Sequence, residues 1–303
     1  MTFKNILVAL DGSSNSQLAA EYGFWLASNL GASLAGQHVV DPRLVDLFIE
    51  PEFAEELGFG TSVETSEKVF SALRKIGKVV LDLFAREAAS RGIKITTFLD
   101  EGYVADELVK YGDQFDLLIM GHRGKGRRTL PSRLMLGSIA ERVAINADVP
   151  ILIAVQPVTR VKQILVAYDG SEPARGALLM AENLAQNTGA KLKAVTIVTS
   201  DQNKAEAKFL VEEGESFLRE YSSENVFSIE EGSVSNTLLG YANNTDSLLV
   251  LGAYGFKDPD TNVLGSTTTK VIRETKSSVL IFRPGRGSQK AKSPERLKEF
   301  VRK

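Results

Sequence analysis

The sequence contains no cysteine and only two histidines, His38 and His122. Without cysteine there can be no disulfide, no catalytic thiolate and no cysteine-ligated metal. Two histidines far apart in the chain argue against a histidine-rich metal site. The chain also lacks an excess of either charge, because 36 Lys and Arg residues against 38 Asp and Glu residues give a net charge of −2 at pH 7. This balance gives no electrostatic reason to expect a nucleic acid partner.

Long hydrophobic runs are missing as well. No segment reaches the roughly 20 apolar residues of a membrane span. The first residues, MTFKNILVALDGSS, lack the long apolar core and small-residue cleavage site of a secretion signal. We therefore expect no membrane contact and a cytoplasmic location. The apolar fraction of 43% and the charged fraction of 24% are typical of a soluble globular protein.

An internal duplication organises the 303 residues. KNILVALDGS returns 158 residues later as KQILVAYDGS, and GASLAGQHVV returns at the same offset as GAKLKAVTIV. Further on, FDLLIMGHRG matches TDSLLVLGAYG, and LGSIAERV matches LGSTTTKV, in the same order. An ordered repeat of this length indicates two copies of one domain. We place the copies at residues 1–158 and 159–286, followed by a basic tail at residues 287–303.

Each copy alternates short apolar runs with stretches of helical periodicity. Continuous apolar runs are typical of strands that are covered on both faces. The alternation requires crossover connections, so it predicts an α/β fold with two Rossmann-like, doubly wound domains. Each domain should be a five-stranded parallel sheet flanked by helices. The first copy has about 27 extra residues after its second strand, and the segment from Leu44 to Phe59 is apolar enough to cover a cleft or contact a partner.

Glycines and hydroxyls follow the fourth apolar run of the second copy, at Gly252, Gly255, Gly265, Ser266 and Thr267. Doubly wound sheets bind ligands beyond the carboxyl ends of their strands, where the strand order reverses. Backbone N–H groups at a helix start suit a phosphate group. If the first and fourth strands are neighbours, their loops line one crevice that could hold an anion. Ordinary turn glycines, with Ser266 as a helix N-cap, are the alternative.

Two common nucleotide motifs do not fit this pattern. The first strand ends in Asp-Gly-Ser instead of continuing into G-x-G-x-x-G, and no Gly-Lys-Ser/Thr of a Walker A loop follows the glycines. The spacing G-x2-G-x9-G-S/T after the fourth strand, with Asp-Gly-Ser after the first, closely resembles the universal stress protein family. The resemblance covers both copies. It implies a tandem family member that binds ATP or another adenine nucleotide, with or without Mg²⁺, as a stress-response or signalling module.

The resemblance also implies which residues contact the nucleotide. The first-strand end would lie beside the base and ribose, a second-strand residue would contact adenine through its backbone, and the glycines and hydroxyls would surround the ribose and phosphates. In the second copy these residues are Ala167, Tyr168, Asp169, Ile197, Gly252, Gly255, Gly265, Ser266 and Thr267. In the first copy they are Ala9, Leu10, Asp11, Val39, Gly121, Gly124, Gly137 and Ser138. Helix capping is the alternative for the two aspartates.

The phosphate loops of the two copies depart from the family pattern in opposite ways. In the first copy, Gly124 and Gly137 enclose the twelve residues KGRRTLPSRLML where the pattern has nine. This basic loop either reaches phosphates with its side chains or is displaced from the site. In the second copy, Asp258 and Asp260 would repel a bare triphosphate unless they face solvent or a Mg²⁺ ion intervenes. We rank the second site above the first.

Other functions stay open. No two residues are arranged as nucleophile and base, so we expect binding instead of turnover, and at most a slow ATP hydrolase. A scaffold or dimerisation protein with degenerate nucleotide sites is the other alternative. In this family the last strand of a domain often pairs with that of a partner domain. VPILIAV and SVLIFRP are therefore candidates for pairing the two domains within one chain, and the resemblance also allows a homodimer.

Overall fold

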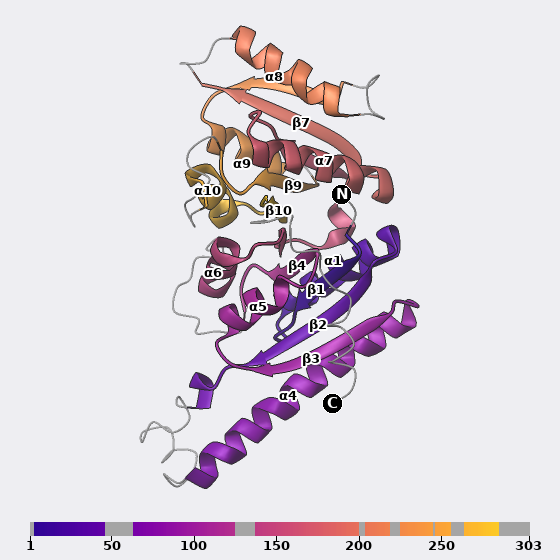
Figure 1. Ribbon diagram of the computed structural model, residues 1–303, viewed down its shortest axis with the longest axis vertical. Helices are drawn as coiled ribbons and strands as arrows, with labels where there is room; N and C mark the ends of the chain where they lie inside the picture. The colour runs from indigo at the N-terminus through magenta and orange to yellow at the C-terminus, as the bar shows by residue number, and fades with distance from the viewer. Residues whose placement is uncertain are drawn as a thin grey trace.

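The fold is known from a computed structural model, which describes residues 3–45, 63–124, 137–199, 204–218, 225–244, 246–255 and 264–284. The first copy contributes the strands β1 (Asn5–Ala9), β2 (Ser33–Val40), β3 (Ile95–Glu101), β4 (Leu117–Gly121) and β5 (Ile151–Ala154). The second copy contributes β6 (Gln163–Ala167), β7 (Lys191–Val198), β8 (Phe227–Glu231), β9 (Ser247–Gly252) and β10 (Val279–Phe282). The ten strands form one continuous sheet (Figure 1).

Strand order in the sheet is β3-β2-β1-β4-β5-β10-β9-β6-β7-β8. Within each copy every pair of neighbouring strands is parallel. In the first copy the strand order reverses at β1, which has β2 and β3 on one side and β4 and β5 on the other. In the second copy it reverses in the same way at β6. The prediction of two doubly wound, five-stranded units is therefore confirmed. The first and fourth strands of each copy are neighbours, so the condition for one crevice between their loops is met.

The two copies are joined where β5 and β10 pair antiparallel, with Leu152 opposite Leu280 at the centre of the register. The predicted pairing of the two last strands within one chain is thus confirmed. Polar contacts reinforce the junction, because Ser278 Oγ accepts a hydrogen bond from the backbone N–H of Val155 at 3.0 Å. Arg283, which is buried at the end of β10, donates to the carbonyl oxygen of Ala144 in the other copy at 3.1 Å.

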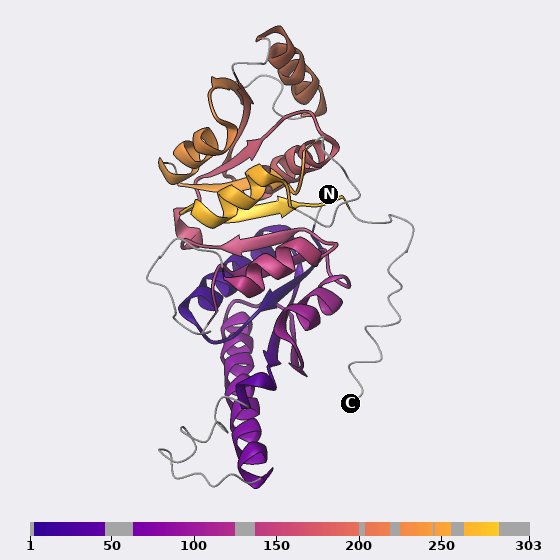
Figure 2. The ribbon, with the colours of Figure 1, turned by 90° about the vertical axis from the view of Figure 1, so that its left-hand side faces the viewer.

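Helices cover both faces of the sheet (Figures 1 and 2). One face carries α1 (Ser14–Leu30), α4 (Val63–Ser90), α7 (Glu172–Thr188) and α8 (Lys204–Phe217). The other carries α5 (Val104–Gly112), α6 (Ser138–Asn146), α9 (Val234–Asn244) and α10 (Ser266–Glu274). A short 3-10 helix, Val158–Arg160, links the copies. Each face buries its own apolar cluster, so the sheet is covered on both sides as its continuous apolar strands require.

The helix that follows the first strand ends in the same way in both copies. Ser13 and Ser171 are the N-caps of α1 and α7, and each side chain accepts a hydrogen bond from a backbone N–H in the first turn. Gly31 and Gly189 end these helices with φ of 65° and 70°. Only glycine adopts this left-handed conformation without steric cost, which explains why both helices end at a glycine.

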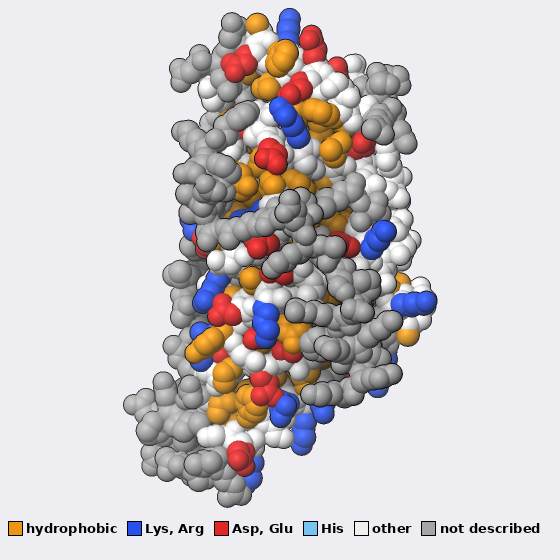
Figure 3. Space-filling view, viewed as in Figure 1, with side chains coloured by type: hydrophobic (Ala, Val, Ile, Leu, Met, Phe, Trp, Pro, Cys, Tyr) orange, Lys and Arg blue, Asp and Glu red, His pale blue; other side chains and the backbone are white. Residues whose placement is uncertain are grey.

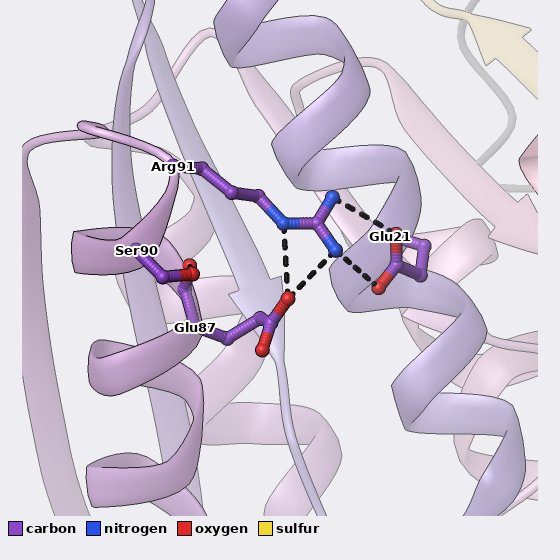
Figure 4. A network of polar contacts seen from close by, with 4 residues as sticks. All are labelled: Glu21, Glu87, Ser90 and Arg91. Atoms are coloured by element: carbon purple, nitrogen blue, oxygen red, sulfur yellow. Dashed lines mark hydrogen bonds and ion pairs between the residues drawn. The ribbon is translucent and has the colours of Figure 1, made fainter.

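The C-terminal end of α4 is fastened to α1 by Arg91, as Figure 4 shows. The Arg91 guanidinium donates to both carboxylate oxygens of Glu21, at 3.1 and 2.9 Å, and also to Glu87, at 3.1 and 2.8 Å. Its carbon Cζ lies 4.6 Å from the ring centroid of Phe24. The two carboxylates raise the pKa of Arg91 further above its already high value. One planar side chain thus holds two helices that cover the same face.

The described residues carry surface charges of both signs, and their helices are not of the membrane-spanning kind, as expected from the balanced charge and the short apolar runs of the sequence. On the face shown in Figure 3, Lys and Arg side chains are interspersed with Asp and Glu over the described part of the chain. Among the residues described, no helix combines the length and the apolar character that crossing a membrane requires. Residues 46–62, which make up most of the extra apolar segment, and the tail from residue 285 lie outside the described residues.

Replacing Arg91 tests the link between α4 and α1. We expect Arg91→Ala to lower the free energy of unfolding by about 1–2 kcal/mol, since it removes a bidentate pair and a cation–π contact at a partly exposed site. Arg91→Lys should recover less than half of this loss, because an ammonium group cannot form the fork. Urea denaturation measures both. Lys110→Ala, which removes an exposed pair with Glu107 inside α5, is the control, and an equal loss there would contradict the special role of Arg91.

Candidate functional site

The end of the first strand forms the same turn in both copies. After β1, Asp11 Oδ1 accepts a hydrogen bond from the backbone N–H of Ser13 at 2.9 Å. After β6, Asp169 Oδ1 accepts one from the N–H of Ser171 at 3.0 Å. The intervening glycines have φ of 72° and 78°, a conformation that explains the Asp-Gly pair. Because serine is the helix cap, the alternative of the aspartates as N-caps is wrong, and each aspartate instead closes the turn before the cap.

The glycine at the end of the fourth strand lies very close to the first turn of the helix that follows the first strand. A Cβ atom at Gly121 would lie 2.7 Å from the carbonyl carbon of Asn15 in α1. A Cβ atom at Gly252 would lie 3.0 Å from the carbonyl carbon of Pro173 in α7. Backbone atoms cannot move aside as a flexible side chain can, so only glycine lets these segments approach. This contact brings the loops after the first and fourth strands together.

The second glycine of each motif faces the aspartate of the first-strand turn. A Cβ atom at Gly255 would lie 3.2 Å from Asp169 Oδ2, and one at Gly124 would lie 2.7 Å from Asp11 Oδ2. The predicted aspartate and the predicted glycine are therefore neighbours in both copies. They come from segments that are more than eighty residues apart in the second copy and more than a hundred apart in the first.

The third glycine of each motif is the N-cap of the following helix. Gly137 precedes α6 and Gly265 precedes α10, and neither can supply a side-chain cap. Their N–H groups donate to the carbonyl oxygens of His122 and Ala253, at 2.8 and 2.9 Å, which fixes each helix start against the end of the fourth strand. Ser138 and Ser266 are consequently the first helical residues. The alternative of Ser266 as an N-cap is wrong by one position.

The threonines behind Gly265 divide between structure and surface. Thr268 is buried, and its hydroxyl donates to the carbonyl oxygen of Gly252 at 2.9 Å. Thr267 is half-buried and Ser266 is exposed at the start of α10. The hydroxyl of Thr268 thus ties α10 to β9, and that of Thr269 lies 3.5 Å from the carbonyl oxygen of Leu264. Ser266 and Thr267 lie at the helix start beside the glycine motif.

The residues expected beside the base lie on two neighbouring strands. Ala167 and Ile197 are half-buried, and both pack against the apolar cluster on the face of α9 and α10. In the first copy, Ala9 packs on the equivalent face and Val39 is half-buried in β2. These four positions stay compatible with a ligand at the carboxyl edge of the sheet.

Tyr168 has its side chain in the core on the opposite face. Its ring packs edge-on against Phe227, with centroids 5.6 Å apart, and its hydroxyl donates to Glu213 Oε2 at 3.0 Å. Burial, followed by the hydrogen bond to Glu213, raises the pKa of Tyr168 to about 12, so the hydroxyl stays a donor. A ligand could reach only the backbone of Tyr168. Leu10, its counterpart, is buried as well.

The backbone carbonyl after the first strand is bonded in the same way in both copies. His38 Nδ1 donates to the oxygen of Leu10 at 2.7 Å, and Thr196 Oγ1 donates to the oxygen of Tyr168 at 3.0 Å. His38 therefore has a structural role, since its ring fixes the backbone just beyond the end of the first strand. His122 follows β4 directly, and burial together with the charge of Arg123 lowers its pKa, which favours the neutral ring at pH 7.

Parts of both phosphate loops fall outside the described residues. These are the basic residues between Gly124 and Gly137, and Asp258 and Asp260 in the second copy. In the described part of the chain, no three His, Cys, Asp or Glu side chains come together as metal ligands. The expected Mg²⁺ therefore stays a prediction.

Comparison with known proteins gives the family. The model of the universal stress protein family matches residues 2–155 and again residues 160–283. The chain belongs to the universal stress protein family, and it carries two tandem copies of the family domain. A universal stress protein of Synechocystis is 27% identical over 289 residues, which cover 92% of this chain and 100% of that protein.

Two further relatives support the same conclusion. A universal stress protein of Methanocaldococcus jannaschii is 33% identical over 158 residues, which cover 51% of this chain and 84% of that protein. Among solved structures, a universal stress protein from Archaeoglobus fulgidus superposes with a TM-score of 0.69 at 22% identity, and covers 93% of this chain and 98% of its own. The likeness to the solved structure supports the tandem fold.

The close approach at Gly252 can be tested by stability. We expect Gly252→Ala to lower the free energy of unfolding by about 1–3 kcal/mol, because the new methyl group meets the backbone of Pro173. Gly240→Ala in α9 is the matched control. Nothing lies within 4 Å of its Cβ position, so it should leave the protein as stable or up to about 1 kcal/mol more stable. Similar losses in both variants, measured by chemical denaturation, would contradict the close approach.

Proposed function

We propose that the protein binds an adenine nucleotide, ATP or AMP, at the carboxyl edge of the sheet in each of its two units, residues 1–158 and 159–286. The observation that carries the proposal is a geometry that occurs twice. An Asp-Gly-Ser turn meets a glycine of the fourth-strand loop, and a glycine-capped helix begins beside them. Its role would be that of a stress-response or signalling module.

The chemistry of these positions favours an anionic ligand that carries hydroxyls. Gly137 and Gly265 leave the first-turn N–H groups of α6 and α10 without a side-chain cap, and these groups carry the positive end of the helix dipole. Phosphate oxygens are suited to this position. Asp169 Oδ2 lies at the glycine loop and could accept a hydrogen bond from a ribose hydroxyl.

Binding without efficient turnover is the function that these residues support best. The aspartate at the site is held in a turn, and Thr268 is bonded to the backbone. Neither is placed as a base beside a nucleophile. A scaffold with degenerate sites remains the second candidate, favoured by the longer first loop, and the two functions differ in whether the purified protein takes up nucleotide at all.

The helix start of the second unit should dominate binding. A valine at Gly265 puts Cβ 3.3 Å from the Cα of Tyr254 and crowds the start of α10. We expect Gly265→Val to weaken ATP binding by at least about tenfold, equivalent to 1.4 kcal/mol. Gly137→Val should have a smaller effect, and Gly240→Ala should have none. Titration calorimetry with ATP and with AMP measures all three. If ATP binds equally to the wild type and Gly265→Val, or to neither, the proposed site is wrong.

Hydrolysis can be separated from binding in the same preparations. We expect phosphate release from ATP by the wild type to be no faster than by Gly265→Val, because none of the residues that the structure describes is placed as a general base for attack by water. A steady-state assay with saturating ATP measures it. Release that is much faster in the wild type, and lost in the variant, would instead establish an ATP hydrolase.

A further inference from the structure

Helix α4 presents an apolar face to solvent in addition to the face that packs on the sheet. Toward the sheet, Gly77 is so close to β2 and β3 that a Cβ atom there would lie 2.6 Å from the ring of His38 and 2.7 Å from the side chain of Leu99. Leu81 and Phe84 are buried on the same side. Figures 1 and 2 show α4 at one end of the molecule, outside the edge strand β3.

The outer face, here called the α4 seam, consists of Ala72, Ile76, Val79 and Leu83. All four are exposed, and the three large side chains are 51%, 56% and 59% exposed. Their spacing of four, three and four residues is that of the a and d positions of a coiled coil. Contiguous apolar side chains on a protein surface are a mark of interaction sites, whereas single exposed ones are normal.

The duplicated half shows that the fold does not require this seam. Helix α8 occupies the place of α4 in the second copy, and Gly214 approaches the neighbouring strand there as Gly77 does. With these glycines aligned, Leu218 matches Leu81, and both are buried. At the positions of Ile76 and Val79, however, α8 has Glu213 and Ser216. The seam belongs only to the copy with the longer helix.

We propose that the α4 seam is a contact with a second copy of this chain, in which two α4 helices pack antiparallel about a two-fold axis. With Ile76 opposite the partner's Val79, Leu83 lies opposite the partner's Ala72, so a large side chain meets a small one. Both chains of the dimer make the same contacts, as a two-fold interface requires. The free edges of β5 and β10 are already paired with each other inside the chain, so these two strands cannot pair with a second chain.

Charge complementarity selects the antiparallel arrangement. Lys75 and Asp82 flank the seam on one side, at equivalent heptad positions. In the antiparallel register, Lys75 faces the partner's Asp82 and Asp82 faces the partner's Lys75. A parallel pairing would place Asp82 opposite the partner's Glu87, a like-charge pair. Arg91 holds the end of α4 against α1, so the helix is positioned before it meets its partner.

Sedimentation velocity over about a hundredfold range of protein concentration tests the contact. The wild type should pass from monomer to dimer. Ile76→Asp/Leu83→Asp should weaken dimerisation at least tenfold, because each chain would bury two charges in the interface. The matched control is Phe209→Asp on α8, where the replaced side chain is 65% exposed, and it should dimerise like the wild type. A wild type that stays monomeric, as it would if residues 285–303 covered the seam, or a seam variant that dimerises normally, would overturn the proposal.

A charge exchange tests the orientation and does not depend on the apolar substitutions. Lys75→Glu should weaken dimerisation, since it sets glutamate against the partner's Asp82. Lys75→Glu/Asp82→Lys should restore it, because both pairs become attractive again with opposite signs. Circular dichroism before and after each change checks that the helix is intact. If the double variant dimerises no better than the single variant, the antiparallel register is wrong.

Discussion

The close approach of the fourth strand to the start of the helix that follows the first strand is the constraint on which the candidate site depends. At Gly252 and Gly121 the backbones of two segments meet where any side chain would collide with main-chain atoms of Pro173 or Asn15. Parallel pairing of β6 with β9, and of β1 with β4, brings these segments to one edge of the sheet. Strand pairing and these glycine contacts are enough to place the Asp-Gly-Ser turn, the glycine loop and the glycine-capped helix side by side.

Duplication gives this protein two such edges and two apolar clusters, one on each face of the sheet, to which both copies contribute. The pairing of β5 with β10 turns two five-stranded units into a single ten-stranded sheet, and the side chain of Arg283 reaches across the junction to the carbonyl of Ala144. Because the two units differ mainly in their loops and in the length of α4 against α8, each serves as an internal reference for the other. That comparison separates features required by the fold, such as the glycine contacts, from features of one copy, such as the α4 seam.

Much of this arrangement could be predicted from the sequence, since it rests on order and spacing. The ordered repeat and the apolar runs predict the doubly wound units, and the resemblance to the universal stress protein family implies the pairing of the last strands. The details at the site could not be predicted in the same way. A shift of one residue decides whether Gly265 or Ser266 is the cap, and spacing alone does not resolve it. The side chain of Tyr168 faces the core because of tertiary packing against Phe227 and Glu213.

Hydrogen–deuterium exchange with and without ATP tests the central claim most directly, because it reports on the backbone N–H groups that the account assigns to the ligand. ATP should slow exchange in the first turns of α10 and α6, which begin after Gly265 and Gly137, and in the turn at Asp169. The amides of α9, on the same face but away from the glycine loops, should exchange as before. Exchange that ATP leaves unchanged at these helix starts, or protection confined to other elements, would contradict the account.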